Sequence, residues 1–139
     1  MQKVIVPRIR FEQHRLDNGL RIVLCPTRRV PLIHLNIHYL VGSSYEEPGM
    51  SGFAHLFEHM MFQGSEHVAK NEHGRLVDLA GGRWNASTGK DRTVYFESLP
   101  SNYLDLALWL EADRMRSLKV TAVSYTHLRA HETSLHLVC

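Results

Sequence analysis

The sequence predicts an α+β domain with a mainly antiparallel sheet and packed helices. Apolar residues alternate in some segments and follow helical spacing in others, and the two kinds of segment succeed each other irregularly along the chain. A tight turn between extended segments near the start favours antiparallel pairing. The 139 residues are enough for one domain with one core.

The first strands are expected around an Asn-Gly turn. Asn18-Gly19 lies between apolar alternations and predicts a hairpin that enters a strand over residues 20–25. Residues 32–41 alternate as well. The face of this strand with the more apolar side chains should be the better buried one; it comprises Ile33, Leu35, Ile37, Tyr39 and Val41.

Three helices are expected after these strands. Ser51 is a plausible N-cap for a helix over residues 52–63, and Gly64 should stop it. A second helix should cover residues 71–80 and end at a Gly-Gly pair. Residues 84–99 have the composition of extended chain, and a third helix should run from Pro100 to about residue 118, capped by Ser101 or Asn102.

Composition excludes several classes of function. The formal net charge of +2 is too small to indicate nucleic acid or a membrane surface as a partner. The sequence contains no run of about 18 apolar residues, so it predicts no membrane span. Residues 1–10 do not have the pattern of a secretory signal. The compartment stays open. A cytoplasmic location is favoured, because Cys25 would be the one native cysteine.

The end of the chain has a different character. Residues 123–133 read VSYTHLRAHET, which resembles the translation of an adapter used in sequencing libraries, and residues 136–139 similarly resemble a flow-cell primer. We therefore expect a partial domain over residues 1–122 and a non-native tail over residues 123–139. The alternative is a histidine-rich tail that binds metal or frays into solvent.

One expected helix carries the chemistry. Residues 53–62 read FAHLFEHMMF, and the apolar residues surround the helix, which predicts burial on all sides. The only polar side chains are His55, Glu58 and His59, which project from one face. A fold keeps such groups in a buried helix only when they have partners.

Two imidazoles at positions i and i+4 form a bidentate site that suits zinc. A catalytic zinc takes three protein ligands and leaves one position open for water, whose pKa it lowers to about 7. Glu58 would then act as the general base that takes the proton of this water. The alternative is a core helix with two satisfied histidines and one buried ion pair.

The motif HLFEH is that of the inverzincins, and residues 16–122 resemble the M16 family of zinc peptidases, which includes pitrilysin, insulin-degrading enzyme and the mitochondrial processing peptidase. The resemblance covers LDNGLRIVL at residues 16–24, G-S-x-x-E-x-x-G-x-x-G-x-A-H-L-x-E-H-M-x-F-x-G at residues 42–64, N-A-x-T at residues 85–88, and residues 93–95. It implies the first half-domain of a clamshell zinc endopeptidase. The substrate would be a peptide or unfolded polypeptide, and the partner a second copy or an M16-like subunit.

The resemblance also implies residue roles. Asn85 and Ala86 match an edge strand on which the substrate adds as a further strand, and Phe62 matches a residue near a substrate side-chain pocket. Asn85 has a simpler alternative role as the cap of a turn, and Phe62 as a core residue.

The third zinc ligand is expected to be absent from the chain as written. In the family it is a Glu about 75 residues after the second His, and Leu135 stands near that position. Glu132 is not assigned, and Glu111 comes too early, so that it should be a solvated helix charge near Arg114. The fragment should therefore be inactive as written. The alternatives to a zinc endopeptidase are a non-catalytic M16-like subunit and an inactive metal-binding fragment.

The other histidines are expected to have ordinary roles. His14 and His67 should be exposed, His34 and His38 should share a half-exposed strand face, and His73 should lie on a polar helix.

Overall fold

The computed structural model describes residues 9–27, 29–48 and 51–120, so the predicted tail over residues 123–139 lies outside the described residues. The chain divides into two compact units, residues 1–31 and residues 32–139. None of the helices in the described ranges is long and apolar enough to cross a membrane.

The first unit contains the predicted hairpin. Strands β1 (Glu12–Arg15) and β2 (Arg21–Leu24) pair in antiparallel register. The turn between them is closed by the amide of Leu20, which donates to Oδ1 of Asn18 at 3.1 Å. Gly19 has a φ of 89°, a conformation that favours glycine. The Asn-Gly turn is therefore confirmed.

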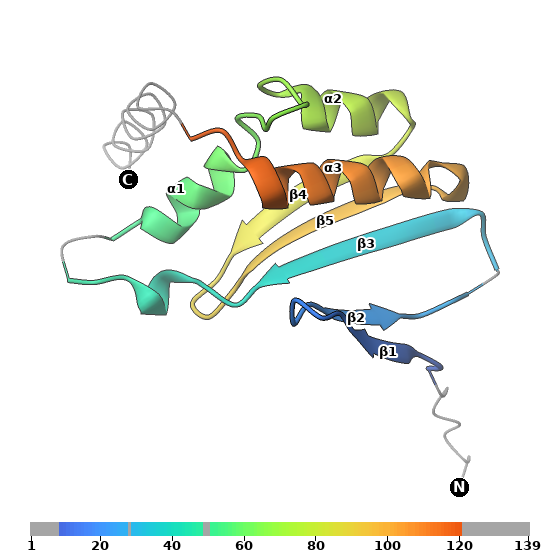
Figure 1. Cartoon of the computed structure of the whole chain (residues 1–139), viewed down its shortest axis with the longest axis horizontal. Coiled ribbons are helices and arrows are strands. Elements are labelled where there is room, and N and C mark those ends of the chain that lie inside the picture. The colour runs from blue at the N-terminus through green and yellow to red at the C-terminus, as the bar shows by residue number, and fades with distance from the viewer. Residues whose placement is uncertain (1–8, 28, 49–50, 121–139) are drawn as a thin grey trace, which may run out of the picture. The chain divides into compact units, whose positions relative to one another are not determined.

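The described residues of the second unit form a three-stranded antiparallel sheet with three helices on one side (Figure 1). Strands β3 (Leu32–Tyr39), β5 (Thr93–Pro100) and β4 (Arg83–Thr88) lie side by side in that order. The helices are α1 (Phe53–Met60), α2 (Glu72–Leu79) and α3 (Leu104–Ser117), with short 3-10 helices at Ser43–Tyr45 and Ser101–Tyr103. The α+β fold class is confirmed, and the extended run over residues 84–99 proves to be a hairpin.

The core lies between the sheet and the helices. Alternate residues of β5 are buried, ending at Leu99, which is fully buried. The core cluster also contains Val68, Val77, Ala80, Ala107 and Leu110. On β3 the face predicted to be better buried is the less exposed one, except that Val41 lies beyond the end of the strand and is 55% exposed.

Beside this core lies a buried polar cluster that corrects two predictions. Glu111 is only 3% exposed and pairs with Arg114 through both carboxylate oxygens, so it is not a solvated charge. His73 is also buried, and its Nε2 contacts Oε1 of Glu97 on β5. The reason is tertiary: α2, α3 and β5 meet here, and each residue finds its partner across the core or one turn away. Burial raises the pKa of Glu111, although the attraction of Arg114 opposes the rise.

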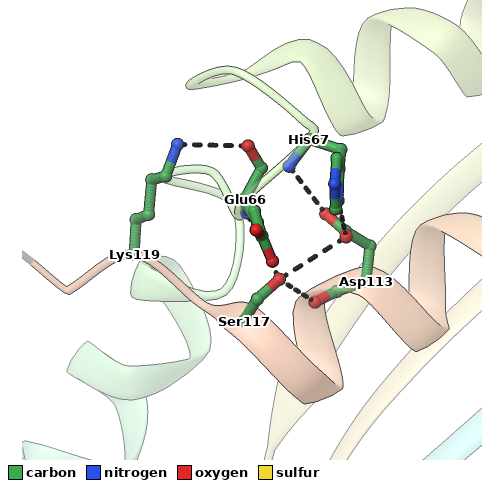
Figure 2. A network of polar contacts seen from close by, with 5 residues as sticks. All are labelled: Glu66, His67, Asp113, Ser117 and Lys119. Carbon is green, nitrogen blue, oxygen red and sulfur yellow. Dashed lines mark hydrogen bonds and ion pairs between the residues drawn. The ribbon is translucent and has the colours of Figure 1, made fainter.

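A second polar network joins the segment after α1 to the end of α3 (Figure 2). Asp113 accepts hydrogen bonds from the backbone amide of His67 at 3.2 Å, and its Oδ1 lies 2.6 Å from Nδ1 of the same residue. Ser117 donates to the carbonyl of Asp113 at 2.8 Å, and Lys119 donates to the carbonyl of Glu66 at 3.3 Å. The imidazole of His67 is exposed, as predicted, but it is held by this carboxylate.

This network predicts a pH-dependent stability. Hydrogen bonds from Ser65 and then His67 lower the pKa of Asp113 from 3.8 to about 2, and the hydrogen bond to Asp113 raises the pKa of His67 above 6.5. The contribution of Asp113 is present above pH 3.8 and is lost as the pH falls towards 2. That of His67 is present below pH 6.5 and is lost as the pH rises through its folded-state pKa.

We therefore expect the stability advantage of the wild type over His67→Gln to be greatest between pH 3.8 and 6.5 and to decline on both sides. Gln keeps a neutral hydrogen-bond donor, so the comparison isolates the charge. Thermal unfolding of both chains from pH 3 to pH 9 measures it. An advantage that is equal at pH 5 and pH 9 would contradict the assignment.

Candidate metal centre

Helix α1 begins at a carboxylate cap. Glu46 accepts hydrogen bonds from the backbone amides of Gly52 at 2.9 Å and Ala54 at 2.8 Å. A negative charge at this place also stabilises the positive end of the helix dipole. The predicted cap, Ser51, is wrong: the N-cap position is occupied by Gly52, with a φ of 91°. Helix α1 is thus fixed by a residue from the preceding segment.

Helix α1 is buried on one face only, which corrects the prediction of burial on all sides. Ala54, Leu56 and Met60 are buried, whereas Phe57 is 49% exposed. Phe57 lines an apolar pocket of about 460 Å³ together with Phe53 and Met61. The apolar composition therefore serves two surfaces, the core and this pocket.

The imidazole rings of the two histidines on α1 approach each other at their Nε2 atoms. Nε2 of His55 and Nε2 of His59 are 3.1 Å apart, the ring centroids are 4.6 Å apart, and both residues are exposed. Two nitrogen ligands of one tetrahedral zinc, each at 2.0–2.1 Å from the metal, would be about 3.3 Å apart. The pair is therefore arranged as two ligands of a single ion would be, and the donor set fits zinc.

Glu58 is half-buried and makes a hydrogen bond to strand β4. Its Oε2 accepts a hydrogen bond from Oγ1 of Thr88, the last residue of the strand. Glu58, His55 and Thr88 all line an open pocket of about 490 Å³ between α1 and the end of β4. The remaining lining residues are Ser43, Glu46, Ser51, Gly52, Ala86, Ser87 and Gly89. A carboxylate beside an imidazole in a pocket open to solvent can accept a proton from water.

The residues expected to bind substrate lie at two different places. Asn85 and Ala86 are on β4, an outer strand of the three-stranded sheet, and Ala86 faces the pocket of Glu58. Phe62 instead packs among aromatic rings, with centroid distances of 4.7 Å to Trp84 and 5.8 Å to Tyr95. The structure brings Ala86 to the site; the binding roles of all three residues stay predictions.

The position expected for a third ligand, near Leu135, lies outside the described residues. Over residues 9–27, 29–48 and 51–120, one group of three potential ligands has donor atoms within 4.8 Å of one another: His73, Glu97 and Glu111. Arg114 already engages both oxygens of Glu111. The positive charge of this guanidinium opposes the binding of a metal cation at the group.

Sequence reasoning missed Glu46 and Thr88 as parts of the site. Both belong to segments already noted for their likeness to the M16 pattern, G-S-x-x-E and N-A-x-T. The only available signal was their place in those patterns, because neither lies at helical spacing from the histidines.

The known proteins that this chain resembles in sequence are named as zinc proteases. A zinc protease from Helicobacter pylori, PqqE, is 37% identical over 112 residues, which are 80% of this chain and 25% of the relative. An uncharacterized zinc protease from Rickettsia bellii is 37% identical over 103 residues, 74% of this chain and 25% of the relative. The family model of the insulinases, peptidase family M16, matches residues 26–132. The chain belongs to this family.

Solved structures agree with this assignment. A protease from Helicobacter pylori superposes with a TM-score of 0.85 at 34% identity, over 88% of this chain and 30% of that one. Pitrilysin has the same fold here, with a TM-score of 0.82 at 24% identity over 93% of this chain and 14% of its own. The chain spans about a quarter of the length of the curated relatives it matches. The family match also extends ten residues beyond the boundary predicted at residue 122, which stays a prediction.

Proposed function

We propose that this chain contains the zinc-binding and general-base helix of a metalloendopeptidase, with His55 and His59 as ligands and Glu58 as the base. The observation that carries the proposal is the convergence of the two Nε2 atoms to 3.1 Å, together with the open pocket that both His55 and Glu58 line. Membership of a family whose relatives are named zinc proteases supports it.

The residues divide the work of hydrolysis between them. A zinc ion bound by the two imidazoles would supply Lewis-acid activation of a water molecule and of the scissile carbonyl group. Glu58 takes the proton of the attacking water and later delivers it to the leaving amine. Strand β4, with Asn85 and Ala86, offers an outer backbone edge on which an extended peptide can add as a further strand.

We propose that the third zinc ligand belongs to a part of the parent protein that the chain as written lacks. An inactive metal-binding fragment remains the second candidate, because the described part of α1 supplies two imidazoles and a catalytic zinc takes three protein ligands. A peptidase assay with metal analysis, on the 139-residue chain and on the complete gene product, separates the two. Zinc with cleavage supports the enzyme, and zinc without cleavage in both supports the binding fragment.

Replacing one ligand is expected to release the metal. In the complete gene product, His59→Ala should lose stoichiometric zinc, because a single imidazole remains on α1. Zinc content after dialysis measures the effect. His38→Ala, an exposed histidine on β3, is the matched control and should keep the wild-type content. Equal zinc content in His59→Ala and the wild type would refute the assignment of the ligand.

A further inference from the structure

We propose that Thr88 is a positioning residue for Glu58, holding the carboxylate in the pocket that His55 also lines. The inference rests on the proposed function, because it gives Glu58 the role of the base. It concerns a contact between two residues 30 positions apart in sequence, Thr88 at the end of β4 and Glu58 in the second half of α1.

The hydroxyl protons can be assigned around this contact. Oγ1 of Thr93 donates to the carbonyl of Val41 at 3.0 Å, which uses its single proton. The oxygens of Thr88 and Thr93 are 3.3 Å apart, a longer separation that needs no proton between them. The proton of Thr88 is therefore available for Oε2 of Glu58. Thr93 is buried and pairs directly with Thr88 across the strands, so it also restricts the orientation of the Thr88 side chain.

One segment, residues 42–46, makes hydrogen bonds both to the turn after Thr88 and to the start of the helix that carries Glu58. The amides of Ser43 and Ser44 donate to the carbonyls of Gly89 at 3.1 Å and Lys90 at 2.8 Å, which hold the turn that follows Thr88. Gly42 lies so close to this turn that an added Cβ would be 2.4 Å from the carbonyl oxygen of Gly89. A few residues further on, Glu46 caps the helix that carries Glu58.

This arrangement gives Thr88 a function that packing alone would not require. A glutamate has three rotatable side-chain bonds, and a carboxylate without a fixed donor spreads over several rotamers. A hydrogen bond from a hydroxyl on a clamped strand selects one of them. The strand that offers an edge to the peptide, β4, thereby also sets the position of the proposed base.

The test compares Thr88→Val, which keeps the shape and removes the donor, with Thr88→Ser, which keeps the donor. In the complete gene product loaded with zinc, we expect Val to lower kcat by about tenfold with KM and zinc affinity unchanged, and Ser to stay near the wild type. Crystal structures of the same variants should show the Glu58 carboxylate displaced by Val and retained by Ser.

The outcomes are distinct for the two proposals. Two results overturn the positioning role. One is a Thr88→Val variant with wild-type kcat and an unmoved Glu58 carboxylate. The other is a Thr88→Ser variant whose kcat falls as far as that of Thr88→Val. If the wild type shows no hydrolysis, the orientation of Glu58 in the crystal structures decides alone. Failure of the proposed function would instead appear as a zinc-free wild type or as cleavage that does not depend on Glu58.

Discussion

Replacing Glu58 by Gln is expected to lower kcat for peptide cleavage by about 10²–10⁴-fold while zinc stays bound. The amide keeps the size of the side chain and can still contact Thr88, but it cannot accept a proton from water. Zinc content should not change, because the proposed ligands are His55 and His59. The measurement combines metal analysis with steady-state cleavage of an unstructured peptide by the complete gene product.

The matched control is Glu47→Gln, a nearby acidic residue that is exposed and does not line the pocket of Glu58. It should cleave as the wild type does. If Glu58→Gln binds zinc and cleaves at the wild-type rate, the carboxylate is not the base and the mechanism proposed for this helix is wrong.

The second large effect is expected from the buried cluster. Arg114→Met should lower the free energy of unfolding by about 3–5 kcal/mol, because it leaves the carboxylate of Glu111 buried without its counter-charge. Nε of Arg114 donates to Oε2 of Glu111 at 2.8 Å. The guanidinium carbon also lies 4.4 Å from the ring centroid of Tyr95, so a cation–π contact is lost as well. Urea unfolding followed by circular dichroism measures the change.

Two further variants identify the cause. Arg116→Met removes an exposed cation from the same helix and should change stability by less than about 0.5 kcal/mol. The double variant Arg114→Met, Glu111→Leu removes both charges and should recover most of the loss. A double variant as unstable as Arg114→Met would show that the aromatic packing, rather than the unpaired carboxylate, is responsible.

Local patterns were sufficient for the first hairpin and for the spacing of the two histidines on α1. The Asn18-Gly19 turn and the i, i+4 spacing of His55 and His59 depend on neighbours within a few residues, so the sequence shows them directly. These features need no knowledge of what lies across the core. The predicted stop at Gly64 is wrong, because α1 ends at Met60 with Met61 as its C-cap, and Gly64, at a φ of 116°, lies beyond the end of the helix.

Contacts between distant segments could not be read in the same way. Glu46 reaches the start of α1 from the preceding loop, and Thr88 reaches Glu58 across 30 residues. His73 and Glu97 form their buried contact across 24 residues. Apolar spacing tells which face of an element is buried, but not which polar group it meets there. For this reason the environment of Glu58 and the burial of His73 became known only from the structure.

The outer position of β3 has a practical consequence for handling the chain. Within residues 32–48 and 51–120, β3 pairs only with β5, so in this part of the chain its other edge has no strand partner along Leu32–Tyr39. The strand contains no Lys, Arg, Asp, Glu or Pro, the residues with which proteins commonly protect such edges. Concentrated solutions of this chain should therefore form strand-to-strand aggregates from β3, and one lysine at exposed Asn36 is the change that should keep it monodisperse.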